Sequence, residues 1–344
     1  MCREHDVPDP RPGELLIRVT HAGVCGTDAH RLTGDLPPPP APICFGHEGV
    51  GVVEVLGADI TRDRAGVPLA EGDRVTWSPP TPCGRCRTCR AGETTALCTR
   101  MVWPPPFGPT TSASFQDYAT VRDTAAFYRV PDGVTSESVI AFGCAMPTAL
   151  GGLARLGDVR GAFVVVQGSG PVGLATCVAA LDAGARAVTM IGDPPARLAV
   201  ARRLGAMETL PLATTTVEER RTRILDLTEG LGAPIVVEAA GHITAFDEGL
   251  GLLAVGGRYL ILGLYSGSAT TPFNPVLVNN RQLTVLGSLG GPLAAYQRAV
   301  EIAIRHGQTL GFDALVTASF PLEQTAQAIE RAQSGRVIKV VVNP

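Results

Sequence analysis

The 344-residue chain is poor in aromatic side chains, at 5%, and has no excess of positive charge, with 29 Lys and Arg against 32 Asp and Glu. Proteins that bind nucleic acid or an anionic membrane through charge need a strongly basic surface, and a net charge of −3 provides none. We therefore expect neither nucleic acid nor a membrane as partner.

Long apolar runs are missing as well. No stretch reaches the roughly 18–20 apolar residues of a membrane-spanning helix, and the first residues do not resemble a signal peptide. The nine cysteines are odd in number, which argues against a disulfide framework. We expect reduced thiols that bind metal in a cytoplasmic protein.

The features that are abundant favour an α/β protein of two domains, since 45% of residues are hydrophobic and 40 are glycine. From residue 161 onward, apolar strands alternate with helices, which predicts a doubly wound parallel sheet. The expected strands are 163–166, 187–191, 235–238, 258–264 and 283–287, with helices at 196–204 and 218–228. Outside this region we expect strands at 14–20, 50–56, 114–121 and 337–342 and helices at 137–141, 293–306 and 323–333.

A glycine-rich turn follows the first of these apolar strands and precedes a helix of small residues. The pattern Gly-x-Gly-x-x-Gly in this context predicts a dinucleotide site, because its glycines permit a tight turn, a close approach to the pyrophosphate and close helix packing. The pyrophosphate would lie at the helix N-terminus. The predicted cofactor-binding residues of the turn are Gly168, Gly170, Pro171, Val172 and Gly173.

Four cysteines, at 83, 86, 89 and 98, lie within one short glycine-containing segment. Their spacing is typical of a tetrahedral Cys₄ zinc site, which leaves no position for water and is therefore structural. A redox pair is disfavoured because no thioredoxin-like context surrounds the cysteines. An iron–sulfur cluster is the remaining alternative, since spacing alone does not exclude it.

Two further motifs, Gly23-Val-Cys25-Gly-Thr27-Asp28-Ala-His30 and Gly46-His47-Glu48-Gly49-Val-Gly51, contain a cysteine and a histidine in glycine-punctuated loops. Each residue alone would be read as structural, but such loops are where functional residues concentrate. The aromatic residues Trp103 and Phe107 in a proline-rich loop either line a substrate pocket or pack that loop.

These motifs, in this order and with Cys144 before the fingerprint, resemble the zinc-dependent medium-chain alcohol dehydrogenases over nearly the whole chain. The resemblance implies a GroES-like β-rich catalytic domain, residues 1–147 and 288–344, and a Rossmann domain, residues 148–287, with the active site between them. It implies an NAD(P)-dependent oxidoreductase that transfers a hydride between the cofactor and a primary or secondary alcohol, giving the aldehyde or ketone.

The same resemblance assigns roles to individual residues. The Cys₂His ligand set of the catalytic zinc is known from alcohol dehydrogenases and is carried over here; Asp28 would orient the imidazole, and the Glu48 position approaches the metal in some relatives. The implied residues are Cys25, His47 and Cys144 for the catalytic zinc; Cys83, Cys86, Cys89 and Cys98 for the structural zinc; Thr27 and His30 for proton relay; Glu48 beside the metal; Thr148 for the nicotinamide; and Lys339 for the pyrophosphate.

Cofactor choice depends on the end of the second Rossmann strand. NAD-preferring relatives place an acid at the Gly192 position, and here it is displaced to Asp193. Arg197 nearby suits the 2′-phosphate of NADP, whereas Asp193 would repel it. We expect NAD, with NADP as the alternative.

The chain also departs from its relatives in two ways. It starts about twenty residues late, so that an opening strand is expected to be missing, and the segment between Cys89 and Cys98 is one residue longer. A catalytically inactive sensor or scaffold is the alternative function, favoured only by the late start. A zinc-free reductase is disfavoured by the cysteine and histidine motifs.

The expected substrate is an apolar or moderately polar alcohol, because the candidate pocket residues are mostly uncharged. Polyol-type relatives carry glutamate where this chain has Cys144, which disfavours a sorbitol-like substrate. We expect a dimer or tetramer formed through edge strands around 259–264. The candidate pocket residues are Ser78, Pro79, Trp103, Phe107 and Leu289.

Overall fold

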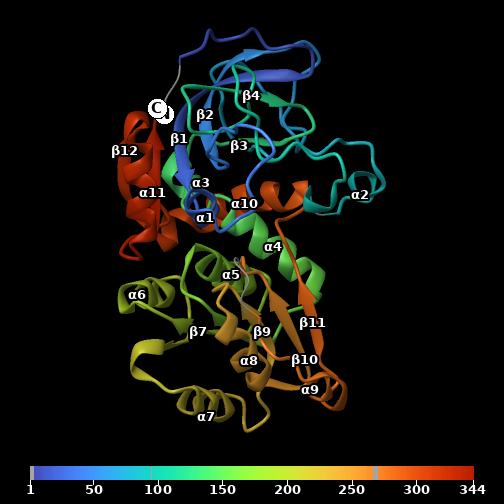
Figure 1. Ribbon diagram of the computed structural model, residues 1–344, viewed down its shortest axis with the longest axis vertical. Helices are drawn as coiled ribbons and strands as arrows, with labels where there is room; N and C mark the ends of the chain where they lie inside the picture. Colours follow the sequence, from blue (N-terminus) through green and yellow to red (C-terminus); the bar gives the residue numbers. More distant parts are fainter. Residues whose placement is uncertain (1–3, 94, 266–269) are drawn as a thin grey trace. The chain divides into compact units, whose positions relative to one another are not determined.

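The computed structural model describes residues 4–93, 95–265 and 270–344 (Figure 1). The chain forms two compact units, unit 1 with residues 1–147 and 291–344 and unit 2 with residues 148–290. The expected second boundary, 287/288, lies slightly before the observed one. The reason is that the N–H of Ser288 still donates to the carbonyl of Ile261 in the sheet of unit 2.

Unit 1 contains a seven-stranded sheet of order β12-β13-β1-β2-β3-β5, in which β4 also pairs with β1. Alternate residues of its strands are buried in one apolar core, and a smaller buried cluster contains Val50, Ile140 and Val341. The elements are β1 (Glu14–Val24), α1 (Gly26–Thr33), β2 (Gly49–Leu56), β3 (Arg74–Ser78), α2 (Arg87–Arg90), β4 (Tyr118–Arg122), β5 (Ala126–Arg129), α3 (Ser136–Ile140), α10 (Leu293–Leu310), β12 (Val316–Pro321), α11 (Thr325–Gln333) and β13 (Lys339–Asn343).

Strand β1 is the centre of this sheet because it is long enough to have different partners at its two ends. On one side it pairs with β2 along most of its length; on the other side its first half pairs with β4 and its last residues pair with β13, where Val24 lies opposite Val340. The residue after β1 therefore lies beside the start of the last strand of the chain.

Unit 2 contains a six-stranded parallel sheet of order β11-β10-β9-β6-β7-β8. Strand β6 is buried throughout, which explains its uninterrupted apolar sequence. The elements are α4 (Ala145–Leu156), which begins in unit 1, β6 (Phe163–Gln167), α5 (Pro171–Asp182), β7 (Ala187–Gly192), α6 (Pro195–Arg203), β8 (Glu208–Pro211), α7 (Val217–Leu227), β9 (Ala233–Glu238), α8 (Ile243–Leu252), β10 (Leu253–Ile261), α9 (Pro275–Asn280) and β11 (Thr284–Gly287).

The strand order confirms the predicted doubly wound fold. The chain runs outward from β6 to β8 and then returns to start again at β9 on the other side of β6. The carboxyl ends of β6 and β9 therefore meet at the point where the winding reverses, which is where ligands bind in open α/β sheets.

Two sequence-based expectations about strands are wrong. The strand expected from 114 begins only at Tyr118, because the N–H groups of Ser114 and Phe115 donate to the carbonyls of Gly46 and Phe45 rather than to a neighbouring strand. Residues 259–264 are not an edge, because β10 pairs with β9 on one side and β11 on the other. Among the described residues the edges of this sheet are β11 and β8.

Candidate functional site

A cluster of metal-binding side chains lies where three segments of unit 1 meet. Cys25 follows β1, His47 precedes β2 and Cys144 precedes α4. The ligand atoms of these residues and of Glu48 all lie within 4.8 Å of one another, and the two sulfurs are 3.3 Å apart. The three residues that the motifs suggest as ligands are thus neighbours in space.

The chemistry of this cluster fits a zinc ion. Two thiols and an imidazole are ligands that zinc prefers, and tetrahedral coordination with Zn–S bonds of about 2.3 Å places two sulfurs about 3.8 Å apart. The observed separation needs only a small movement to meet that value. Three protein ligands would leave a fourth position for a substrate oxygen, as in catalytic zinc sites.

Asp28 connects two of these candidate ligands. Its Oδ1 lies 3.3 Å from Nδ1 of His47, and its Oδ2 accepts the N–H of Cys25 at 3.0 Å. Burial alone would lower the pKa of His47, but the charge of Asp28 raises it well above its usual value. An Nδ1–H directed at Asp28 leaves the Nε2 lone pair of the imidazole for a metal.

Glu48 is held from two sides. Its Oε1 accepts the N–H of Cys144 at 2.8 Å, and its Oε2 accepts from the ammonium of Lys339, which also donates to the carbonyl of Val24 at 3.4 Å. The side chains of Glu48 and Lys339 are 1% and 2% exposed. Lys339 is the only lysine in the sequence.

The space for this carboxylate exists because two neighbouring positions are glycine. A Cβ atom on Gly23 would lie 2.0 Å from Oε2 of Glu48, and one on Gly143 would lie 2.2 Å from its Cδ. Gly143 also has a φ of 38°, which disfavours other residues. The turn that presents Cys144 is therefore built around Glu48.

The pair is ionised. Burial opposes the charge on each group, but the ammonium of Lys339 lowers the pKa of Glu48, and the carboxylate raises the pKa of Lys339. The resemblance suggests a pyrophosphate contact for Lys339, and that stays a prediction. The contacts observed for its ammonium are with Glu48 and Val24 in unit 1.

Replacing Lys339 by Met should lower the free energy of unfolding by about 3–5 kcal/mol, because the change leaves the carboxylate of Glu48 buried without its counter-charge. Chemical denaturation measures this directly. The exposed Arg336 is a matched control, and Arg336→Met should change stability by less than about 0.5 kcal/mol. Equal effects of the two substitutions would contradict the role given to the ion pair.

The two residues suggested for proton relay lie on α1. The hydroxyl oxygen of Thr27 is 3.8 Å from the sulfur of Cys25, so it lies beside the candidate metal centre. His30 is more exposed, and its Nδ1 lies 3.1 Å from Oδ2 of Asp35. Thr27 and His30 share one face of the helix because they are three positions apart, as a proton relay between them requires. The relay itself stays a prediction.

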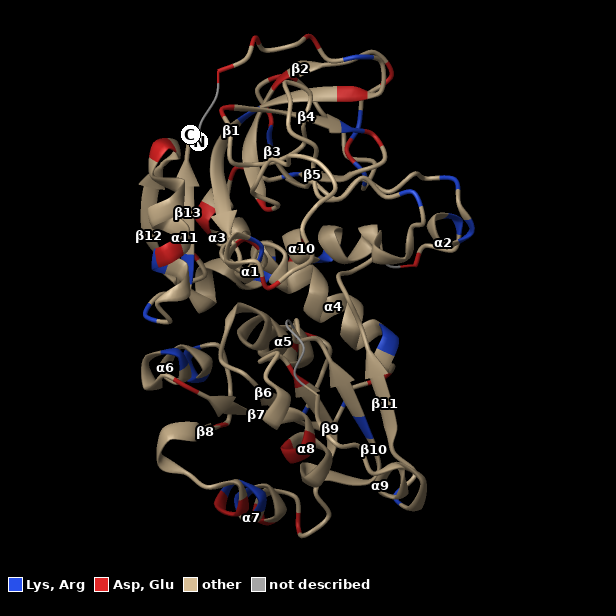
Figure 2. Cartoon of the chain, viewed as in Figure 1, with Lys and Arg blue, Asp and Glu red and all other residues tan. Residues whose placement is uncertain are grey.

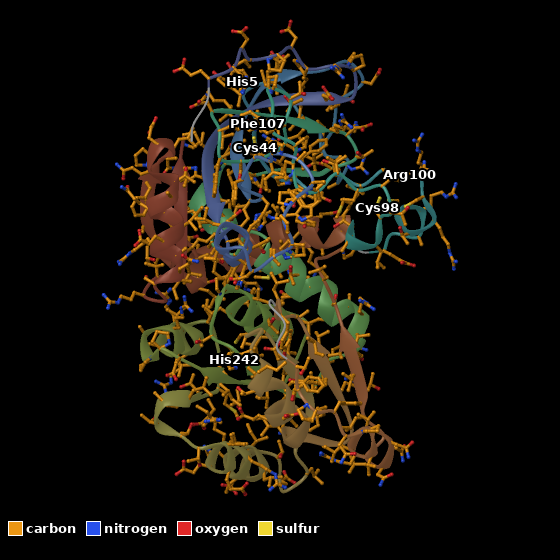
Figure 3. The ribbon with its side chains drawn as sticks, in the orientation of Figure 1. His5, Cys44, Cys98, Arg100, Phe107 and His242 are labelled. Carbon is orange, nitrogen blue, oxygen red and sulfur yellow. The ribbon has the colours of Figure 1, made fainter. Side chains whose placement is uncertain are left out.

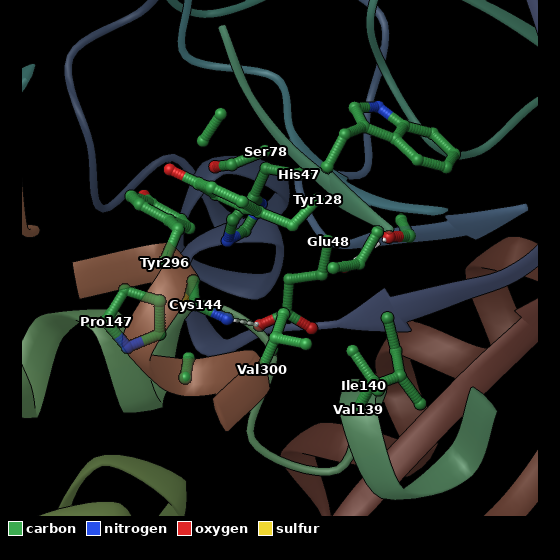
Figure 4. Close-up of a pocket in the computed structure, with 16 residues that line it drawn as sticks. His47, Glu48, Ser78, Tyr128, Val139, Ile140, Cys144, Pro147, Tyr296 and Val300 are labelled. Carbon is green, nitrogen blue, oxygen red and sulfur yellow. Dashed lines mark hydrogen bonds between the residues drawn. The ribbon is translucent and has the colours of Figure 1, made fainter. Parts of the chain in front are cut away.

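Two cavities adjoin the candidate metal centre within unit 1. The first lies on the side of Glu48 and Cys144 and is lined by Tyr296 and Ser78 (Figure 4). Burial raises the pKa of Tyr296 to about 12, against the effect of its hydrogen bond with Ser78, so the phenol stays neutral near pH 7. This cavity offers neutral hydroxyl groups and apolar surface.

The second cavity lies on the side of Thr27 and Asp28. Its wall includes the indole of Trp103, which meets the His47 ring edge-on at a centroid distance of 5.5 Å and an angle of 79°. The guanidinium carbon of Arg31 lies 5.9 Å from the Trp103 ring centroid.

Only two of the five candidate pocket residues line one of these cavities. Ser78 lines the first cavity and Trp103 the second, whereas Pro79, Phe107 and Leu289 line neither. The Phe107 ring instead contacts the His5 ring at 5.5 Å, and Figure 3 shows both near the N-terminal segment. The observed ring contact of Phe107 is thus with the N-terminal segment.

The four-cysteine segment forms a second cluster in unit 1, around α2. The sulfurs of Cys83, Cys86, Cys89 and Cys98 lie within 4.8 Å of one another. Cys86 lies 3.4 Å from Cys89 and 3.9 Å from Cys98, sulfur to sulfur, which suits a tetrahedral zinc. Residue 94, in the lengthened part of the segment, lies outside the described residues. Several arginines lie on this lobe, seen as the blue segments around α2 (Figure 2).

In unit 2, the glycine-rich turn has the geometry that a dinucleotide site requires. Gly168 has a φ of 107°, which other residues rarely adopt, and α5 begins at Pro171. A Cβ on Gly173 would lie 1.8 Å from the carbonyl oxygen of Gly168, whereas one on Gly170 would meet nothing within 4 Å. Gly173 is thus needed for packing, and Gly170 leaves the open space.

The residues expected to select the cofactor follow β7. A Cβ on Gly192 would lie 2.6 Å from the hydroxyl oxygen of Ser169, which itself donates to the carbonyl of Asp193 at 2.7 Å. Glycine at 192 is therefore a packing requirement of this turn. Burial lowers the pKa of Arg197, which follows on α6. Thr148 is half-buried in α4, and its contact with a nicotinamide stays a prediction.

Substitution of the two glycines should separate folding from cofactor binding. Gly173→Ala should destabilise the protein by about 1–3 kcal/mol, because the added methyl overlaps backbone. Gly170→Ala should leave stability nearly unchanged and weaken binding of NAD(H), because its methyl would occupy the pyrophosphate space. Thermal unfolding and NADH titration measure the two effects. Normal NADH affinity in Gly170→Ala would contradict this site.

Sequence reasoning did not identify the partner of Glu48 or the two tyrosines near the metal centre. Tyr296 lines the first cavity from α10, and Tyr128 donates to the carbonyl of Leu293 at 2.7 Å. The one signal in the sequence for this partner is that Lys339 is the single lysine among 29 basic residues.

Comparisons with known proteins agree with this geometry. Two family models match the chain, the alcohol dehydrogenase GroES-like domain over residues 11–132 and the zinc-binding dehydrogenase over residues 171–305. A 5-exo-hydroxycamphor dehydrogenase of Pseudomonas putida is 39% identical over 97% of this chain and 93% of its own length. An L-threonine 3-dehydrogenase of Anaeromyxobacter dehalogenans is 32% identical over 99% and 94%.

Solved structures give the same result. An alcohol dehydrogenase from Thermotoga maritima superposes with a TM-score of 0.91 at 30% identity, over 99% of this chain and 95% of that one. A zinc-binding dehydrogenase from Sinorhizobium meliloti bound to NADP gives 0.85 at 27%, with the same coverage. Within the described residues, no helix is both long and apolar enough to span a membrane.

Proposed function

Because the chain belongs to the zinc-dependent medium-chain alcohol dehydrogenases, it is an NAD(P)-dependent oxidoreductase of alcohols, and we propose that it oxidises a secondary alcohol to a ketone at a zinc held by Cys25, His47 and Cys144. The observation that carries the proposal is the convergence of these three side chains within 4.8 Å. A zinc bound there would supply a Lewis acid that lowers the pKa of the substrate hydroxyl.

The reaction balances with the cofactor alone. The alcohol carbon gives a hydride, with its electron pair, to NAD(P)⁺, and the hydroxyl proton leaves to solvent. We assign the first step of the proton path to Thr27, whose hydroxyl lies beside Cys25, and the second to His30, whose exposed imidazole reaches solvent.

The preference for a secondary alcohol is supported by the names of relatives. Hydroxycamphor and threonine 3-dehydrogenases, and a sorbitol dehydrogenase of Halalkalibacterium halodurans at 29% identity, are similar over nearly the full chain. The hydroxyl groups that the first two names specify are secondary. Cys144, where polyol-type relatives carry glutamate, favours a substrate other than a sugar alcohol.

We propose a second, structural zinc at the four cysteines around α2, since four thiolates leave no open position. The alternative of an inactive sensor or scaffold has no support from the site, because every proposed catalytic ligand and the dinucleotide turn are present. A homo-oligomer, dimer or tetramer, is proposed from the family, with β11 in place of β10 as the available edge strand.

Cys25→Ala and His47→Ala should each abolish alcohol-dependent NAD(P)H formation while leaving the fold and NAD(H) binding largely unchanged. The reason is that each removes a ligand of the catalytic metal without touching unit 2. Steady-state assays, circular dichroism and NADH titration measure the three properties. Cys177→Ala, a buried cysteine outside both clusters, is the control and should stay active. Full activity in either variant would contradict the assignment of Cys25 and His47 as ligands of a catalytic zinc.

The cofactor preference can be measured as the ratio of kcat/KM for NAD and NADP. We expect NAD to be preferred, because Asp193 would repel a 2′-phosphate. In Asp193→Asn, kcat/KM for NADP should rise relative to NAD, and Arg197→Ala should reverse that gain. A wild-type preference for NADP of tenfold or more would overturn the prediction.

A further inference from the structure

The second cavity beside the candidate metal centre has one arginine in its wall. Arg31 lines it together with Thr27, Asp28 and His47, and most of the remaining wall is apolar, with Phe45 and Trp103 as its aromatic members. Arg31 is half-buried. The first cavity, on the Glu48 side, has no Lys or Arg in its wall. Of the two cavities, only the second therefore has an arginine or lysine in its wall.

No carboxylate neutralises this guanidinium in the described part of the chain. Its recorded contact is with the face of Trp103, at 5.9 Å from the ring centroid. The two nearest carboxylates in sequence are occupied, since Asp28 binds His47 and Cys25, and Asp35 accepts from Thr33 at 2.7 Å and contacts His30. A half-buried guanidinium without an anion loses hydration without full compensation, which favours an anionic ligand.

The position of Arg31 sets where that ligand would bind. Arg31 lies four residues after Thr27 on α1, so the two side chains share one helix face about one turn, or roughly 5.4 Å, apart. Thr27 lies at the candidate metal centre and Trp103 spans from the His47 ring to Arg31. A molecule whose hydroxyl is beside Thr27 would place a group a few bonds away near the guanidinium.

We propose that Arg31 determines the substrate specificity of this enzyme. Its substrate is a secondary alcohol in which a short spacer joins the hydroxyl carbon to an anionic oxygen group, either a carboxylate or a phosphoryl group. The guanidinium fork matches both groups and binds them in bidentate fashion. The Trp103 face keeps the fork in place and covers the spacer. This inference rests on the proposed function.

Matched pairs of substrates test the proposal. The zinc-replete enzyme is assayed with 3-hydroxybutyrate and its methyl ester, and with 2-hydroxypropylphosphonate and its dimethyl ester, for both enantiomers. In the wild type, kcat/KM should be at least about tenfold higher for the acid of a pair than for its ester, mainly through KM. The pair with the larger ratio distinguishes carboxylate from phosphoryl recognition.

The variant Arg31→Gln should lower kcat/KM for the preferred acid by about tenfold to hundredfold and change the ester by less than about threefold. Arg31→Lys should recover part of the loss, because it restores charge without the fork. Arg186→Gln, which removes an exposed arginine of unit 2, is the control and should change neither. Equal use of acids and esters by the wild type, or an equal loss for both in Arg31→Gln, would overturn the proposal.

The outcome separates this proposal from the function on which it rests. Oxidation of the esters and 2-butanol without preference for acids would refute the anion site and leave the dehydrogenase function supported.

If no alcohol reduces NAD(P)⁺, the proposed function fails, but ligand binding still tests the role of Arg31. Trp103 is one of only two tryptophans, so 3-hydroxybutyrate should change protein fluorescence saturably, with an affinity at least about tenfold weaker in Arg31→Gln. Identical titrations would contradict the proposal.

Discussion

The buried ion pair between Glu48 and Lys339 is the interaction on which the candidate metal centre depends. The pair joins the start of β2 to the start of β13, and through Oε1 of Glu48 it also fixes the backbone of Cys144. The ammonium reaches the carbonyl of Val24, the residue before Cys25. One carboxylate and one ammonium thus position the backbone at both cysteines, while Asp28 orients His47.

The energetics of this arrangement explain its surroundings. Two buried charges lose their hydration, so the pair is tolerated only when its remaining hydrogen-bonding groups are also satisfied. Besides each other, Glu48 accepts the N–H of Cys144, and Lys339 donates to the carbonyl of Val24. Glycines at 23 and 143 leave room for the carboxylate, at the cost of chain flexibility in the unfolded state. The result is a set of candidate ligands whose atoms all lie within 4.8 Å of one another.

The sequence predicted those features that depend on local patterns. The glycine turn after an apolar strand, the spacing of the four cysteines and the alternation of strands and helices in unit 2 are all short-range signals, and the doubly wound parallel sheet follows from them. The start of β4 was missed because the loop at 45–46, far away in sequence, takes its first N–H groups. The internal position of β10 depends on pairing with β11, which no local pattern specifies.

The contacts between distant residues were the least predictable. Glu48 and Lys339 are 291 positions apart, and only the pairing of β1 with both β2 and β13 brings them together. The cavity position of Arg31 likewise depends on Trp103, which a separate loop supplies. The motifs therefore indicated which residues are candidate metal ligands, but neither the contacts that position those residues nor the charges that lie beside them.

Elemental analysis of zinc per chain tests the central claim most directly. The account predicts two zinc ions per wild-type chain and one in Cys25→Ala, because the cluster around α2 keeps its metal when the cluster of Cys25, His47 and Cys144 loses one ligand. A wild-type chain with a single zinc that survives the Cys25→Ala substitution would show that the catalytic centre described here does not hold a metal.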